Sequence, residues 1–115
     1  MNKLNYHKWG KDHQITFEIH KYADNDNLAI LMISWDEGYP EHWSTLTVNL
    51  DEKCKPTCAF IDTNNNGEDI VKWLVDNKLG HPTGKLGFSG FCVYPEFEFD
   101  MDELKKYMES GDIGA

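Results

Sequence analysis

An unbroken apolar run in the first third of the chain constrains the fold more than any other feature of the sequence. The residues from Leu28 to Ile33 are all aliphatic, alanine or methionine. A run of this kind, bounded by polar segments, is typical of a strand that is covered on both faces. We therefore expect residues 28–35 to form the central strand of a sheet.

The segments on either side of this run alternate between apolar and polar residues. Residues 15–20 and residues 43–50 both show a period of two, which predicts strands with one buried face. A polar turn cluster at 23–27 and a loop with glycine and proline at 36–42 separate the three segments. This order predicts an antiparallel meander.

The periodicity changes in the second half of the chain. Apolar residues recur at helical spacing over 70–75, Asn66 is placed to cap a helix, and Gly80 is placed to end it. This pattern predicts a helix over 68–79. The same spacing predicts a short last helix over 101–108.

The remaining segments complete the expected fold. Residues 58–61 predict a fourth strand, and the glycine-rich segment 81–90 predicts a loop. Residues 91–99 predict one or two strands broken at Pro95. We therefore predict an α+β fold, in which two helices pack on an antiparallel sheet of four to five strands.

Length and composition indicate one domain in the cytoplasm. At 115 residues without a linker or repeat, the chain 1–115 is expected to form a single domain, with 110–115 as a frayed tail. The first residues lack the apolar stretch of a secretory signal, and no segment is long enough to cross a bilayer. Three cysteines, an odd number, suit free thiols in a reducing compartment.

The charge of the chain narrows the class of partner. The net charge is −9, and all 11 basic residues are lysines. Such a field repels phosphate, and arginine, the side chain that binds phosphate through two hydrogen bonds, is absent from the sequence. We therefore expect no direct binding to nucleic acid and an attraction for basic proteins. The alternative interpretation is that the acidic surface only keeps the protein soluble.

Carboxylates near the C-terminus are the candidate contacts with such a partner. Alternating acidic residues on a strand project from one face, and further ones begin the last helix. Rows of carboxylates on rigid elements imitate backbone phosphates, so a DNA mimic of this kind can occupy the nucleic-acid channel of an enzyme. A solvated acidic face without a partner is the alternative. The predicted contacts are Glu96, Glu98, Asp100, Asp102 and Glu103, with the loop residues Lys85 and Phe88 as further candidates.

The segment Asp62–Gly67 matches only the opening of a calcium-binding loop, in which alternating side-chain oxygens precede a glycine. The twelfth position holds Trp73 in place of a bidentate glutamate, and a strand is expected before the loop where a helix would be required. Turn formation and helix capping explain the Asp and Asn residues. We therefore expect no calcium site.

The cysteines and histidines also fall short of a metal or catalytic pattern. Cys54 and Cys58 have a spacing found in zinc sites, but the other ligands would have to be Cys92 with His42 or His81. Apolar neighbours predict buried, inert thiols at Cys58 and Cys92. No nucleophile stands in a recognisable arrangement with a base, so no enzyme, metal or cofactor is predicted.

Several segments together resemble a known family. They are Leu46–Leu50, Cys58–Asn66, Pro82–Gly84 and Gly90–Phe99, with an apolar helix between the second and the third. Over residues 28–105, the sequence resembles a family of small proteins of unknown function that phages and conjugative elements of Firmicutes carry. The family has no established catalytic residues, so the resemblance implies none here.

The resemblance implies a role on a mobile genetic element. Small acidic proteins of such elements often disable host defence, as anti-restriction and anti-CRISPR proteins do. We therefore expect an anti-defence protein that binds and inhibits a basic nucleic-acid enzyme. The favoured target is the CRISPR type II nuclease Cas9, and a restriction enzyme is another.

Two alternatives stay open. One is a metal-binding or catalytic accessory protein of a mobile element, centred on Asp62, Asn64, His81 and Cys92. The other is a homodimeric interaction module that pairs through a free strand edge.

Overall fold

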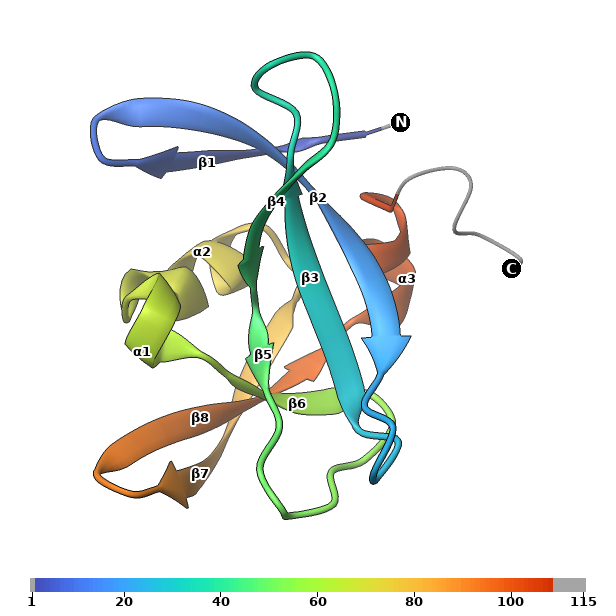
Figure 1. Cartoon of the computed structure of the whole chain (residues 1–115), viewed down its shortest axis with the longest axis vertical. Helices are drawn as coiled ribbons and strands as arrows, with labels where there is room; N and C mark the ends of the chain where they lie inside the picture. The colour runs from blue at the N-terminus through green and yellow to red at the C-terminus, as the bar shows by residue number, and fades with distance from the viewer. Residues whose placement is uncertain (1, 109–115) are drawn as a thin grey trace.

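Two antiparallel sheets of four strands each form most of the structure (Figure 1). The computed structural model describes residues 2–108. The elements in chain order are β1 (Leu4–Lys8), β2 (Lys11–Lys21), β3 (Leu28–Ser34), β4 (Glu41–Thr45), β5 (Thr47–Val48), β6 (Cys58–Ile61), α1 (Thr63–Asn66), α2 (Asp69–Asp76), β7 (Gly80–Ser89), β8 (Cys92–Phe99) and α3 (Met101–Lys105). The strand order is β1-β2-β3-β4 in the first sheet and β5-β6-β8-β7 in the second. The α+β class is confirmed, and the strands outnumber the prediction because they form two sheets.

The apolar run that the sequence shows lies in β3, between β2 and β4 in the first sheet. All residues of β3 except Leu31 are buried. Strand β2 pairs with it along its length, from Ile15 opposite Ser34 to Lys21 opposite Leu28. The predicted central strand is therefore confirmed.

The chain passes from the first sheet to the second at Leu46, between β4 and β5 (Figure 1). The N–H of Leu46 donates to the carbonyl of Ile30 at 2.8 Å, and its carbonyl accepts from the N–H of Asp62 at 2.9 Å. The side chain of Leu46 is fully buried. The alternation over 43–50 predicts one strand, but these bonds place neighbouring residues in different sheets, so the strand is divided.

The segment 81–90 lies almost entirely within β7, so the prediction of a loop is wrong. Gly87 within it permits close packing of the strand. A Cβ atom on Gly87 would lie 2.4 Å from Leu50 Cδ1 and 2.7 Å from Phe60 Cε1, so the strand could not approach these residues with a larger side chain. Glycine inside a strand often marks such a close approach.

Three short helices connect or follow the strands. Asp62 caps α1 and Asp100 caps α3, each by accepting a hydrogen bond from a backbone N–H of the first turn. The predicted helix over 68–79 is confirmed as α2, although it is shorter at both ends. Asn66, predicted to cap that helix, is instead the last residue of α1. The predicted helix over 101–108 begins at the expected residue and ends three residues early, as α3.

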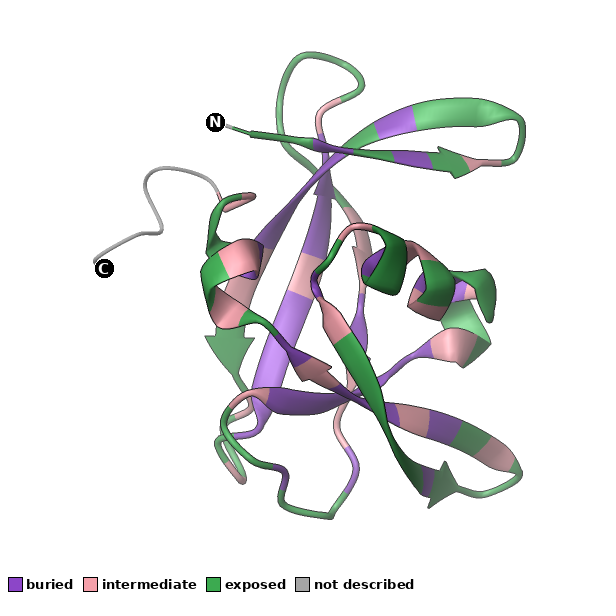
Figure 2. Ribbon diagram, turned by 180° about the vertical axis from the view of Figure 1, so that it is seen from behind, coloured by how far each residue is buried: buried purple, intermediate pink, exposed green. Residues whose placement is uncertain are grey.

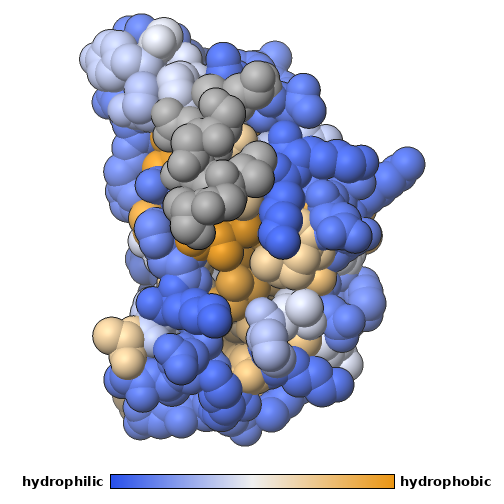
Figure 3. Space-filling model, turned by 90° about the vertical axis from the view of Figure 1, so that its right-hand side faces the viewer, coloured by the Kyte–Doolittle hydropathy of each residue, from blue (hydrophilic) through white to orange (hydrophobic). Residues whose placement is uncertain are grey.

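Helix α3 and the residues after it pack against the first sheet. The N–H of Phe17 in β2 donates to the carbonyl of Tyr107 at 2.9 Å. Leu104 is fully buried, and Ile19 and Met101 are half-buried against the core. Seen from this side, the molecule shows an apolar area within a mostly hydrophilic surface (Figure 3). The predicted tail at 110–115 lies outside the described residues.

The main core lies between the two sheets and is closed by the helices (Figure 2). A second, smaller core lies on the other face of the second sheet. Within residues 2–108, no helix is long and apolar enough to cross a membrane. The fully buried members of the main core include Phe17, Ile30, Leu46, Ile61, Leu74 and Phe97, and the second core holds Leu50, Cys54, Cys58, Phe60 and Tyr94.

The junction between the sheets gives a first prediction. Leu46→Ala is expected to lower the free energy of unfolding by about 2–5 kcal/mol, because it removes a buried side chain where both sheets meet. Leu86→Ala is the control, since Leu86 is half exposed, and its effect is expected to stay below about 0.5 kcal/mol. Urea unfolding measures both values. Equal small effects would contradict the role of Leu46 as the junction.

Candidate functional site

Exposed apolar side chains gather on the hairpin formed by β7 and β8. Phe91, in its turn, is fully exposed, Phe88 is 67% exposed, and Leu86 and Val93 are about half exposed. Seven large hydrophobic side chains are exposed among residues 2–108, and these four lie on one hairpin. We call these four residues the apolar stripe.

The register of the hairpin explains why these side chains are exposed together. Phe88 lies opposite Val93, and Leu86 lies opposite Pro95. Residues two apart on a strand share a face, so Val93 and Pro95 continue the face of β8 that carries the buried Phe97. The hairpin extends beyond the core (Figure 1). The residues near its turn, such as Phe88 and Val93, are therefore exposed, whereas Phe97, farther from the turn, is buried.

A groove runs along the edge of this hairpin. Strand β7 is the outer strand of its sheet, and the loop after β5 lies beside it. The groove has a volume of about 400 Å³ and is lined by Asn49, Leu50, Asp51 and Glu52 and by residues 86–89. An edge strand presents backbone groups that can pair with a segment of another protein.

Carboxylates border the groove. Asp51 and Glu52 line it, and Asn49 Nδ2 holds Asp24 beside it by donating to Asp24 Oδ1 at 2.8 Å. Glu52 also pairs with Lys85 at 3.1 Å. We call the three exposed carboxylates of Asp24, Asp51 and Glu52 the acidic rim. Negative charge therefore lies next to the apolar stripe.

A buried asparagine holds the segments that carry the acidic rim. Asn27 Nδ2 donates to the carbonyl of Glu52 at 2.9 Å, and Asn27 Oδ1 accepts from the N–H of Cys54 at 2.9 Å. Asn25 Nδ2 donates to Asn49 Oδ1 at 3.0 Å. The turn after β2 and the loop after β5 thus form one unit, which presents the rim in a fixed position.

Two of the predicted contact residues, Lys85 and Phe88, belong to this hairpin. Glu96 and Glu98 lie on the other face of β8, in a separate cleft that cysteines and lysines also line. Glu96 is only 9% exposed and accepts a hydrogen bond from Thr83 Oγ1 at 2.7 Å. Its carboxylate is therefore largely occupied within the protein.

The other three predicted carboxylates do not line that cleft, although Asp100 lines a neighbouring hollow with Glu98. Asp100 caps α3, Glu103 pairs with Lys106 at 2.9 Å, and Asp102 is exposed in the first turn. The five acidic residues thus extend from the cleft of Glu96 and Glu98, through a neighbouring hollow that Glu98 and Asp100 line together, to the first turn of α3. Their role as partner contacts stays a prediction.

Sequence reasoning missed the acidic rim and most of the apolar stripe. A signal for the stripe exists, because Leu86 and Phe88 alternate with Gly87 and Ser89. The surrounding glycines indicate a loop more strongly than this short alternation indicates a strand. The rim carries no local signal, since its members come from segments that meet only in the fold.

Comparison with known proteins places the chain in a family. A family described as a domain of unknown function (DUF4313) matches residues 16–112. The chain belongs to this family. The DUF4313 match begins within β2 and includes the hairpin, the groove and α3. Searches of the curated proteins and of the solved structures found no match.

The cysteines are free thiols in different surroundings. Cys54 and Cys58 are buried, as predicted for Cys58, whereas Cys92 is partly exposed. Burial raises the pKa of Cys54 to about 11, with Glu96 adding to the shift, and burial also raises the pKa of Cys58. Among residues 2–108, no group of three His, Cys, Asp or Glu side chains is arranged to hold a metal ion.

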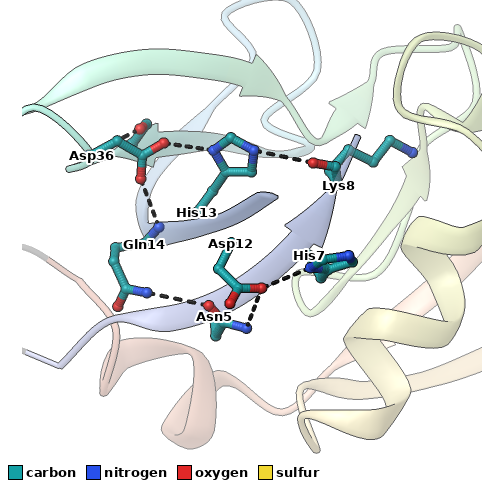
Figure 4. A network of polar contacts seen from close by, with 8 residues as sticks. Asn5, His7, Lys8, Asp12, His13, Gln14 and Asp36 are labelled. Atoms are coloured by element: carbon teal, nitrogen blue, oxygen red, sulfur yellow. Dashed lines mark hydrogen bonds and ion pairs between the residues drawn. The ribbon is translucent and has the colours of Figure 1, made fainter. Parts of the chain in front are cut away.

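Two histidine–aspartate pairs connect strands near the other end of the molecule (Figure 4). His13 is buried, with Nδ1 2.6 Å from Asp36 Oδ2 and Nε2 3.4 Å from the carbonyl of Lys8. His7 Nδ1 lies 2.7 Å from Asp12 Oδ1 on the surface. Within the described residues, neither ring hydrogen-bonds to a serine, threonine or cysteine. The pairs therefore support the hairpin structure and activate no nucleophile there.

The pairing of Asp36 with the buried His13 predicts a pH dependence. Hydrogen bonds from His13 and from the N–H of Gln14 lower the pKa of Asp36. The stabilisation is therefore present above a pH of about 4 and is lost as the pH falls through the lowered pKa. Asp36→Asn is expected to cost about 1 kcal/mol at pH 7 and little near pH 2, as measured by urea unfolding. Glu37→Gln, at the exposed carboxylate next to Asp36 in the chain, is the control, and an equal loss there would contradict the assignment.

Thiol reactivity gives another prediction. At pH 8, Cys92 should react first with an aromatic disulfide reagent, because Cys54 and Cys58 are buried and their raised pKa values suppress the reactive thiolate. Cys92→Ser should remove the fast phase, and all three cysteines should react rapidly in guanidinium. A fast phase that persists in Cys92→Ser would be inconsistent with the burial of the other two.

Proposed function

We propose that this chain is a protein-binding domain whose contact surface is the β7–β8 hairpin. The observation that carries the proposal is the apolar stripe, in which four exposed side chains project from one hairpin. Grouped exposed apolar residues mark interaction sites, and buried aromatic residues often dominate binding energy. Phe88 and Phe91 are therefore the expected anchors.

The charge beside the stripe supports a basic partner. The acidic rim borders the groove at the edge of β7, and the whole chain carries a net charge of −9. Complementary charge selects the partner and speeds association, while the apolar anchors contribute most of the affinity. A surface with lysine or arginine next to apolar residues matches both parts of the site.

The partner that we propose is an enzyme that acts on nucleic acids, and binding inhibits it. Such enzymes have positively charged channels, and an acidic protein competes there with the phosphate backbone. The resemblance to proteins of phages and conjugative elements supports an anti-defence role in the bacterial cytoplasm. Cas9 is the first target to test, and a restriction enzyme is the second.

The edge of β7 supports a second candidate, a homodimer in which two hairpins pair. The apolar stripe favours such a contact. Two-fold pairing of this edge would bring two acidic rims together, and their repulsion opposes it at low salt. Sedimentation at low and high salt tests this candidate, which requires a dimer that strengthens as salt increases.

Affinity for purified Cas9, measured by biolayer interferometry, tests the proposed surface. Phe88→Ser is expected to weaken binding about tenfold or more, because it removes an apolar anchor. The pair Asp51→Lys and Glu52→Lys is expected to weaken binding strongly at low salt and less at high salt, because salt screens the charges. The exposed residues Val75 and Glu37 provide matched controls as Val75→Ser and Glu37→Lys, which should bind like the wild type.

Charge reversal of Asp100, Asp102 and Glu103 separates this surface from the carboxylates of α3. If that reversal abolishes binding while the hairpin variants bind normally, the contact lies at α3 and the hairpin is the wrong surface. If neither Cas9 nor a restriction enzyme binds or is inhibited, the inhibitory part of the proposal is wrong. Circular dichroism confirms that each variant is folded.

A further inference from the structure

A second site lies at the other end of the molecule, where the tip of the β1–β2 hairpin stands near α1 (Figure 1). The site is a cavity of about 190 Å³. It is smaller than the roughly 300–1,000 Å³ pockets that hold cofactors and drug-sized ligands. Its size suits a single ring or side chain of a larger partner. The residues that line it are Tyr6, Lys8, Trp9, Trp43, Ser44, Asn65 and Asn66.

Tyr6 contributes a buried hydroxyl that lacks a partner. The residue is 3% exposed, and its Oη is the single buried side-chain oxygen or nitrogen without a hydrogen bond among residues 2–108. Burial and the nearby charge of Asp69 raise the pKa of Tyr6 more than the adjacent Lys8 ammonium lowers it. The hydroxyl therefore keeps its proton, and because Lys8 can only donate, that proton still lacks an acceptor. Buried polar groups almost always have a partner, so this one indicates an external acceptor.

Trp9 forms an open wall of the cavity in an unfavourable backbone conformation. Its φ is +53° and that of Gly10 is +74°, so both central residues of the turn are left-handed. Such turns usually contain Asn followed by Gly, because a bulky residue at positive φ is strained. Trp9 is nevertheless 78% exposed, with its ring centre 5.6 Å from that of Trp43. A ligand-binding role explains an exposed, strained tryptophan better than folding does.

The charges around the cavity indicate an uncharged ligand. Lys8 Nζ donates to Asp69 Oδ1 at 2.9 Å and to the carbonyl of Asn66 at 3.1 Å, and it lies 5.9 Å from the centre of the Tyr6 ring. Its ammonium thus already occupies the place over the Tyr6 ring where a second cation would bind. Its pairing with Asp69 and the net charge of −9 leave little attraction for an anion.

The remaining polar groups favour a ligand that needs few hydrogen bonds. Ser44 Oγ donates to Asn66 Oδ1 at 2.5 Å, and Asn66 Nδ2 donates to the carbonyls of Thr45 and Asp62. These groups are therefore engaged inside the protein. A sugar needs many polar partners, whereas a proline ring needs aromatic walls and a donor such as Tyr6 for the adjacent carbonyl.

We propose that the cavity binds a proline ring within an extended peptide of a partner protein. Trp9 and Trp43 contact the ring, and the Tyr6 hydroxyl donates to a peptide carbonyl. Proline-rich segments suit aromatic-lined sites because their extended conformation is already formed before binding. This site is separate from the apolar stripe, so it does not rest on the proposed function of the hairpin.

NMR spectra of the indole N–H groups test the proposal, with a capped tetraproline peptide as the probe. Glucose and uridine serve as uncharged comparison ligands. The indole of Trp35 donates to Thr16 Oγ1 at 2.8 Å and is a reference away from the cavity. The peptide is expected to shift the signals of Trp9 and Trp43 and to leave that of Trp35 unchanged. Shifts caused by glucose or uridine and not by the peptide would overturn the proline assignment.

Tyr6→Phe removes the hydroxyl alone. The melting temperature should stay the same or rise, because the hydroxyl has no partner in the protein, while affinity for the peptide should fall about five- to tenfold. Trp9→Ala should abolish the shift at Trp43, whereas Val75→Ala, on the exposed face of α2, should not change it. Equal affinity of the wild type and Tyr6→Phe, or no shift with any probe, would overturn the proposal.

Discussion

The backbone hydrogen bonds of Leu46 hold the two sheets in their relative positions. Its N–H binds Ile30 in the first sheet, and its carbonyl binds Asp62 just after β6 in the second. The neighbouring Thr47 strengthens the junction, because its Oγ1 accepts from the N–H of Ile30 at 3.1 Å and lies 3.0 Å from the hydroxyl of Tyr22. Only Leu46 separates β4 of the first sheet from β5 of the second, so the two sheets are held close together. Their facing sides enclose one core. The positions of both hairpins follow from this junction.

Each sheet extends past that core as a hairpin, and both hairpins carry exposed aromatic residues. Trp9 lies in the turn of the β1–β2 hairpin, and Phe88 and Phe91 lie at or beside the turn of the β7–β8 hairpin. A domain of this size has too little volume to cover the full length of its strands. Apolar side chains at these uncovered ends are therefore exposed to solvent, and a bound partner would bury them. The fold thus presents the two proposed binding surfaces on one rigid support.

Ion pairs determine which acidic groups remain available. Asp69, Asp76 and Glu103 lie within 3 Å of lysine ammonium groups, and Glu52 lies 3.1 Å from Lys85. Exposed pairs of this kind contribute little to stability, but they partly neutralise the charge at their positions. Asp24 and Asp51 have no ionic partner within the described residues, so their carboxylates remain available beside the β7–β8 hairpin, where Lys53 donates to the carbonyl of Asn25. That distribution depends on the fold and not on the total charge.

The central strand and α2 were predictable from the sequence because their patterns depend on residues close together in the chain. The strand β7 was not, because glycine content reports backbone freedom and does not report that Leu50 and Phe60 crowd Gly87. The alternation of Glu96 and Glu98 correctly places them on one face, yet only the folded sheet shows that Glu96 is buried. By itself, the sequence determined the class of fold, the sign of the charge and the periodicity of the main elements. Tertiary structure decided which side chains are exposed together, because exposure depends on contacts between segments that are distant in the chain.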